Sequence, residues 1–115
     1  MGLDQYLNVS KGEETEQIGV WRKHSDLQGW MQQLAIKKGL VDSIKDFNCI
    51  DMQLSEEDID NVEEAIKNSM LPKTTGFFFG YSYADEAERE RDLLIFSEAR
   101  DYSNMNWNVY YSCWW

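Results

Sequence analysis

The chain has 115 residues, and its 21 Asp and Glu residues outnumber its 11 Lys and Arg residues, which gives a formal net charge of −10 at pH 7. This charge disfavours direct binding to nucleic acid and adhesion to an anionic membrane, because both depend on clustered cations. The length predicts a single domain over residues 1–115, which can bury a core without disulfides or metals.

The composition predicts a folded cytoplasmic protein. Aromatic residues make up 14% of the chain, and five of them are Trp, whereas disordered acidic chains lack such residues. Two cysteines and no signal-peptide pattern predict reduced thiols and a cytoplasmic location. No apolar run approaches the roughly 18 residues that a membrane span needs, so we expect no membrane partner.

The first part of the chain predicts two strands and a helix. Residues 2–9 alternate loosely between polar and apolar side chains, and residues 18–23 are β-branched and aromatic, so both segments favour strands. The polar segment 10–17 between them predicts a turn or loop. Ser25 and Gln28 form the Ser-x-x-Gln pattern of a helix N-cap with a capping box. Apolar residues follow at helical spacing as far as the stop signal Gly39, namely Leu27, Trp30, Met31 and Leu34.

The remainder predicts three more strands and two more helices. We expect strands at 47–54, 77–79 and 109–115, a helix that begins after the N-cap Ser55, and a helix at 84–100. The last helix is acidic and basic at its start and apolar later, with Ala87, Leu94, Ile95, Phe96 and Ala99. This order of elements predicts an α+β domain with one mostly antiparallel or mixed sheet of about five strands and three helices packed on it.

Four blocks of sequence carry a resemblance. They are Met1-Gly2-Leu3-Asp4 with Tyr6-Leu7, Ile18-Gly19 with Trp21-Arg22-Lys23 and Trp30, Leu71-Pro72 with Gly76-Phe77-Phe78-Phe79-Gly80, and Tyr110-Tyr111-Ser112. Together they resemble, in order, a family of small, largely uncharacterised bacteriophage and prophage proteins. The resemblance implies an accessory protein in the host cytoplasm. Such proteins often counter host defences, some by withholding nucleotide signals and others by imitating nucleic acid.

One departure from that family bears on activity. Where the family usually has Asn and His after Trp-Arg-Lys, this chain has Ser25 and Gln28. An amide does not titrate, so Gln28 cannot replace a catalytic His. Either the family's His recognises a ligand by hydrogen bonding, which Gln28 can share, or this chain has lost an activity. The single histidine of this chain, His24, stands at a different position.

The segment Trp21-Arg22-Lys23 is the main candidate site, because it lies where a strand passes into a helix. Two cations, the free amides of a helix start and an indole suit a phosphate and a base. The alternative is that both cations pair with the protein's own carboxylates and the Trp is core. The full set of candidate ligand-binding residues is Trp21, Arg22, Lys23, Ser25, Gln28, Lys73, Thr75, Tyr110 and Tyr111.

Three functions stay open at this point. The first is a non-catalytic protein that binds a small anionic, nucleotide-like ligand. The second is an acidic interaction protein that mimics nucleic acid and occupies a basic host protein. The third is a phosphodiesterase that cleaves a nucleotide messenger, with Lys23, His24 or a Tyr as acid or base. No Cys and His cluster has ligand spacing, so we expect no metal and no cofactor. The aromatic C-terminus leaves a homo-oligomer open.

Overall fold

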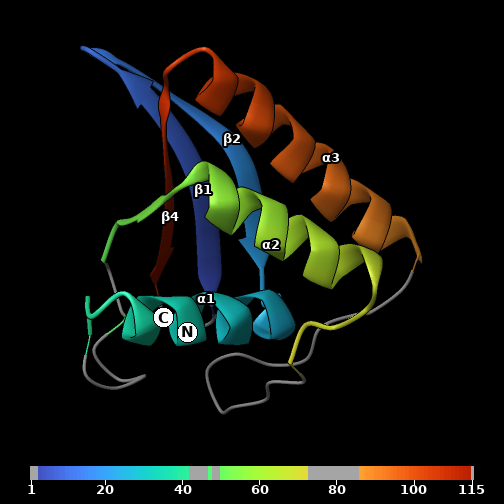
Figure 1. Ribbon diagram of the computed structural model, residues 1–115. Coiled ribbons are helices and arrows are strands. Elements are labelled where there is room, and N and C mark those ends of the chain that lie inside the picture. The colour runs from blue at the N-terminus through green and yellow to red at the C-terminus, as the bar shows by residue number, and fades with distance from the viewer. Residues whose placement is uncertain (1–2, 42–46, 48–49, 73–85, 115) are drawn as a thin grey trace.

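The computed structural model describes residues 3–41, 47, 50–72 and 86–114. Four strands form one antiparallel sheet in the order β2-β1-β4-β3, and three helices accompany it (Figure 1). The predicted α+β class is confirmed, whereas the described residues contain four strands and not about five. The predicted strand 77–79 lies outside the described residues. In chain order the elements are β1 (Asp4–Lys11), β2 (Glu14–Arg22), α1 (Ser25–Lys37), β3 (Met52–Leu54), α2 (Glu56–Lys67), α3 (Glu86–Asn104) and β4 (Asn108–Trp114).

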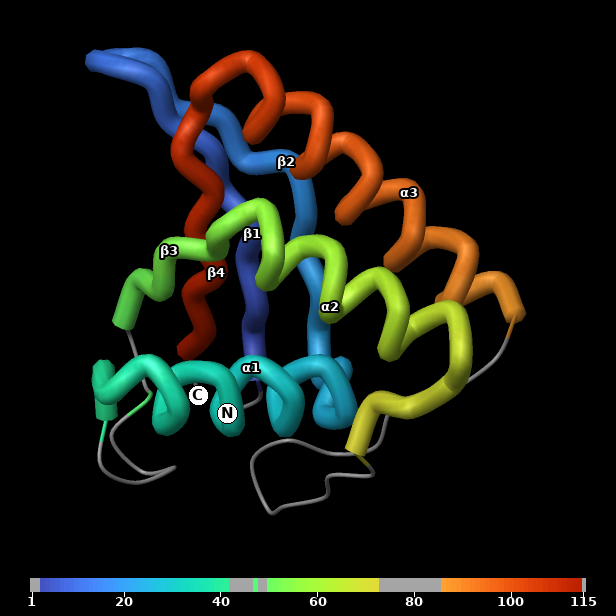
Figure 2. Tube along the Cα trace, viewed as in Figure 1, coloured from blue at the N-terminus to red at the C-terminus, as the bar shows by residue number. Residues whose placement is uncertain are grey.

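The helices cover one face of the sheet and one end of it. Helices α2 and α3 lie side by side in front of the strands, and α1 runs across the strand ends (Figures 1 and 2). Alternate residues of β1 and β4 are buried on this side, as the period of two in a strand requires. Within the described residues no helix is both long enough and apolar enough to cross a membrane.

The turn or loop predicted over 10–17 is too long, because β1 and β2 form a hairpin whose turn is residues 12–13. The strands pair as far as Lys11 opposite Glu14, and Gly12 has a φ of +61°, which fits a two-residue turn with glycine at its first position. From Lys11 to Gln17 every residue is exposed. These strand residues carry no alternation because neither of their faces is buried.

The helix boundaries follow the local signals in two of three cases. Ser55 and Asp58 exchange both capping-box hydrogen bonds at the start of α2, as predicted. Gly39 has a φ of +75° after α1, and hydrogen bonds from Gly39 and Leu40 to the last turn complete a Schellman motif. The N-cap predicted at Ser25 is wrong, because His24 occupies that position.

Helix α3 is longer than predicted. It continues to Asn104, four residues beyond the predicted end. Of the apolar residues named for it, Ile95, Phe96 and Ala99 are buried, whereas Leu94 is 72% exposed and Ala87 is exposed. The carboxylate Asp92 is 2% exposed and shares the buried side of the helix. Among the described residues of the strand predicted at 47–54, β3 is the strand that forms, and residues 48–49 lie outside the described part of the chain.

Gly19 allows β2 to approach α3 closely. A methyl group added to Gly19 would come within 2.7 Å of Ile95 Cγ2 and 3.2 Å of the Trp21 ring. We expect Gly19→Ala to lower the free energy of unfolding by about 1–3 kcal/mol, the usual range for overpacking. Denaturant titration measures it, with Gln17→Ala on the exposed part of β2 as the control.

Measuring Gly19→Ala in a protein that already carries Ile95→Ala separates this clash from other consequences of the substitution. The methyl group that Gly19→Ala would meet belongs to Ile95, and Ile95→Ala removes it. The cost of Gly19→Ala should therefore shrink when both changes are combined, because neighbouring substitutions that share a contact are not additive. An equal cost in both backgrounds would contradict the clash.

Candidate functional site

The turn between β2 and α1 holds its residues in a fixed and costly conformation. Lys23 has a φ of +57°, a region that costs a non-glycine residue of order 1–3 kcal/mol. Its backbone N–H donates to the Leu3 carbonyl at 2.8 Å. The next residue, His24, caps α1 because its Nδ1 accepts from the Leu27 backbone N–H at 3.4 Å. The turn thus fixes the positions of three consecutive residues, the cations Arg22 and Lys23 and the imidazole of His24.

Helix α3 brings two carboxylates to the histidine. His24 Nε2 lies 2.7 Å from Asp92 Oδ2 and 3.2 Å from Glu88 Oε1. The second oxygen of Asp92 accepts from the indole N–H of Trp21 at 2.7 Å. His24 is 5% exposed, so this cluster lies inside the protein. Because one side of the cluster comes from the turn and the other from α3, the contact depends on the whole fold.

A pocket opens above this cluster. It has a volume of about 390 Å³, which is within the size range of small-molecule sites. We call it the turn pocket. It contains three cations, Arg22, Lys23 and Arg91, in a protein of net charge −10. The residues that line it are Trp21, Arg22, Lys23, His24, Ala87, Glu88 and Arg91.

The three cations of the turn pocket differ in their hydrogen-bond and ion-pair partners. Arg22 is exposed, and its Nε lies 3.7 Å from Asp4 Oδ1. Arg91 donates to the Val20 carbonyl. Within the part of the chain that the structure describes, neither Lys23 nor Arg91 forms an ion pair. Their positive charge is therefore not neutralised by a described carboxylate.

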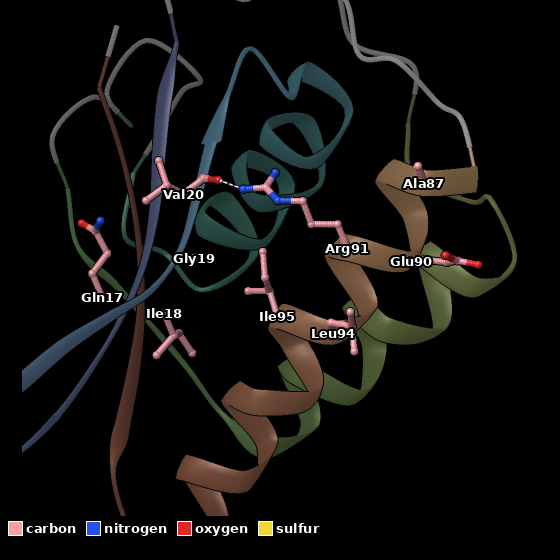
Figure 3. A pocket seen from close by; sticks show the side chains of 9 residues that line it. All are labelled: Gln17, Ile18, Gly19, Val20, Ala87, Glu90, Arg91, Leu94 and Ile95. Carbon is pink, nitrogen blue, oxygen red and sulfur yellow. Dashed lines mark hydrogen bonds between the residues drawn. The ribbon is translucent and has the colours of Figure 1, made fainter.

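A larger groove adjoins the turn pocket and is mostly aliphatic. Figure 3 shows the Arg91 side chain reaching from α3 toward β2, where it bonds the Val20 carbonyl. Arg91 and Ala87 line both hollows, so the two are adjacent. We call this groove, with a volume of about 530 Å³, the side groove. It is lined by Gln17, Ile18, Gly19, Val20, Ala87, Glu90, Arg91, Leu94 and Ile95.

The role predicted for Trp21, stacking on a ligand's base, does not fit its position. Its side chain is 2% exposed, and its ring stacks on Phe96 with the centroids 5.8 Å apart. The indole N–H is also engaged by Asp92. Trp21 therefore forms the floor between the turn pocket and the core.

Three other predicted contact residues lie in the interior and not in the turn pocket. Ser25 is buried in the first turn of α1. Gln28 is buried as well and forms no capping box with Ser25, because its Nε2 contacts Cys113 Sγ at 3.2 Å. The hydroxyl of Tyr111 donates to Gln28 Oε1 at 2.6 Å. A ligand in the turn pocket cannot touch these groups directly.

These interior groups form a polar network that reaches the turn. The Gln5 amide donates to the Tyr111 hydroxyl at 2.9 Å and to the His24 carbonyl at 3.0 Å. Gln5 Oε1 accepts from the His24 backbone N–H at 2.9 Å. Burial and the nearby Cys113 raise the pKa of Tyr111 well above its usual value, while the Gln5 hydrogen bond lowers it in part. Tyr111 is thus a neutral hydrogen-bond donor in this network.

Of the remaining predicted residues, Tyr110 lies away from the turn pocket, and two others are not described. Tyr110 is half-buried and, by the alternation of β4, lies on the opposite face of the sheet from Tyr111. Lys73 and Thr75 lie outside the described residues. Of the nine predicted residues, the turn pocket brings together Trp21, Arg22 and Lys23.

The prediction missed the contribution of α3. Glu88, Arg91 and Asp92 lie at spacings of three and four, which places them on one face of a helix. No residue of this helix was predicted to belong to the site, and the spacing of these three residues was the one local signal that a face of the helix carried a site. The sequence offered no sign that this face meets His24, since the partners are 64 and 68 positions apart.

No protein-family model, no curated protein and no solved structure matches this chain.

Proposed function

We propose that this protein binds a small phosphate-bearing ligand of nucleotide size at the turn pocket. The observation that carries the proposal is the convergence of Arg22, Lys23 and Arg91 from two separate elements on one hollow of an acidic protein. Arginine forks and a lysine ammonium are the groups that proteins use for phosphates. The anionic part of the ligand would lie among these three side chains.

The side groove supports a ligand that also has an apolar part. It begins at Arg91 and continues along aliphatic side chains of β2 and α3, among them Ile18 and Leu94 (Figure 3). A nucleotide-like molecule with its phosphate at the cations can place its base there. This groove takes over the role that Trp21 was predicted to play.

The site supports ligand binding better than it supports catalysis. Both ring nitrogens of His24 already have partners, since Nε2 faces the carboxylates of α3 and Nδ1 accepts from Leu27. An acid or base must reach the proton that it moves. The phosphodiesterase alternative therefore has less support than sequestration of the ligand. Together with the resemblance to phage proteins, this leads us to propose that the protein withholds a nucleotide signal from host defence.

The mimicry alternative also has less support. Asp58 pairs with Lys38, and Arg100 pairs with Asp60 and Glu63. A nucleic-acid mimic presents its carboxylates unpaired to a basic partner. Three carboxylates of α2 already form ion pairs within the protein, so they are not free to pair with a basic partner.

Calorimetry with a panel of nucleotides and cyclic nucleotides, in the presence of a chelator, tests the proposal. We expect Lys23→Asn and Arg91→Gln each to weaken binding about tenfold, because each removes a charge-assisted hydrogen bond. Asn suits the left-handed backbone of Lys23, so that variant removes the charge alone.

Lys67→Gln serves as the control, since Lys67 is an exposed cation of α2. It should leave the affinity for the panel unchanged. The proposal fails if the wild-type protein binds no member of the panel, or if Lys67→Gln weakens binding as much as Lys23→Asn does.

A further inference from the structure

Three donor atoms beneath the turn pocket stand close enough to share one ion. They belong to His24, Glu88 and Asp92, and all lie within 4.8 Å of one another. We propose that these residues bind a divalent transition-metal ion such as Zn²⁺ or Mn²⁺. One imidazole and two carboxylates form a mixed donor set that such ions accept, whereas Ca²⁺ and Mg²⁺ prefer oxygen alone.

The charges of the three residues favour a dication. Asp92 and His24 are more than nine-tenths buried, and the side chain of Glu88 is 20% exposed. The trio thus brings two carboxylates to a mostly buried position, where a bound cation is favoured. A divalent ion between the donors would interact with both carboxylates.

One donor spacing already suits an ion, whereas the 2.7 Å between His24 Nε2 and Asp92 Oδ2 must widen to hold it. The 3.2 Å between His24 Nε2 and Glu88 Oε1 is close to the roughly 3.3 Å that separates two donors in a tetrahedral zinc site with bonds of about 2.0–2.1 Å. Asp92 Oδ1 accepts from the Trp21 indole, and such an outer hydrogen bond orients a ligating carboxylate. Trp21 is therefore a positioning residue for this site.

The open side of the trio faces the turn pocket. His24 and Glu88 line that pocket, and three protein ligands leave a fourth tetrahedral position unfilled. An oxygen of the phosphate-bearing ligand would occupy this position. That last step rests on the proposed function, whereas the metal site itself does not.

Metal binding would also change the proton on His24. A neutral imidazole that binds metal through Nε2 carries its proton on Nδ1, yet Nδ1 now accepts from the Leu27 N–H. The ion would therefore release this capping bond. The chain has one histidine, so ¹⁵N-histidine NMR reports this tautomer without overlap from other residues.

The test is a calorimetric titration of the chelator-stripped full chain with Zn²⁺ and with Mn²⁺, without nucleotide. We expect one ion per chain, and we expect Glu88→Gln to weaken its binding at least tenfold, since even outer-shell changes at metal sites cost 10–100-fold. Glu90→Gln is the matched control, because Glu90 is an exposed carboxylate of the same helix and not one of the three donors. It should bind the ion as the wild type does.

Two further readouts bear on the proposal. We expect Zn²⁺ to move the His24 proton to Nδ1 and to speed amide exchange at Leu27. His24→Asn keeps an N-cap acceptor and removes the imidazole, and it should lose the ion while remaining folded. The metal site is ruled out if the wild type binds neither ion at millimolar concentration, or if Glu88→Gln and Glu90→Gln bind alike. Because the nucleotide titration is done with chelator and the metal titration without nucleotide, either proposal can fail alone.

Discussion

Replacing Asp92 with alanine is expected to lower the free energy of unfolding by about 3–6 kcal/mol, because two buried hydrogen bonds to its carboxylate are lost and each such bond contributes roughly 1.5–3 kcal/mol. Asp92 is 2% exposed and joins the Trp21 indole to the His24 imidazole at 2.7 Å on each side. Alanine would remove the acceptor of the Trp21 indole and the nearer of the two carboxylates at His24 Nε2. Urea denaturation with a chelator present measures the change without any contribution from metal.

Two other variants make this result interpretable. Glu90→Ala removes an exposed carboxylate from the same helix, and we expect a change within about 0.5 kcal/mol. Trp21→Phe keeps a ring against Phe96 but removes the indole donor to Asp92. We expect this variant to lose less than Asp92→Ala does, because one contact of the carboxylate remains. If Asp92→Ala and Glu90→Ala were equally stable, Asp92 would not hold α3 to the turn.

Local signals in the sequence predicted the elements whose causes are themselves local. The capping box of Ser55 and Asp58 involves four consecutive residues, and the stop at Gly39 depends on one backbone conformation. The alternation at 109–113 is visible because one face of β4 is buried. In each case the physical cause lies within a few residues of its effect.

The misses arise where distant residues decide the local structure. Ser25 has good N-cap chemistry, yet it is buried and the cap passes to His24. The strands that extend to Lys11 and Glu14 carry no hydrophobic pattern because their side chains are exposed. Tertiary pairing overrides propensity in both places.

The candidate site could be predicted only in part for the same reason. Its cationic half is contiguous at positions 21–23, so the sequence pointed to it directly. Its other half comes from α3, where Glu88, Arg91 and Asp92 read as part of an acidic surface. Which helix face packs on which turn is a property of the fold, and single-sequence spacing does not contain it.

Replacing Tyr111 with phenylalanine is expected to lower the free energy of unfolding by about 1–3 kcal/mol at pH 7, the cost of a buried polar group left without its partner. The Tyr111 hydroxyl donates to Gln28 Oε1 at 2.6 Å and accepts from Gln5 at 2.9 Å. Phenylalanine would fill the same space, where the ring packs on Phe47, but would leave the Gln28 oxygen without this donor. Denaturant titration at neutral pH measures the loss.

The pH dependence of this variant separates the hydroxyl from the ring. Burial raises the pKa of Tyr111 well above its usual value in the folded protein, so the unfolded chain loses this proton first as the pH rises above about 10. The stabilisation that the neutral Tyr111 hydroxyl gives the folded protein is therefore complete below pH 10. Above pH 10 the free energy of unfolding falls by up to about 1.4 kcal/mol per pH unit, until Tyr111 also loses its proton in the folded protein. Tyr111→Phe lacks this loss, so the stability difference between the two proteins should narrow above pH 10.

Tyr110→Phe is the matched control for that pH series, because Tyr110 is the neighbouring, half-buried tyrosine on the opposite face of β4. We expect its effect at pH 7 to stay within about 0.5 kcal/mol. Other groups that titrate at alkaline pH act equally in the wild type and the variant, so they cancel in the difference. A gap between wild type and Tyr111→Phe that stays constant from pH 7 to above pH 10 would contradict a raised pKa. It would mean that this hydroxyl is not held neutral among Gln5, Gln28 and Cys113.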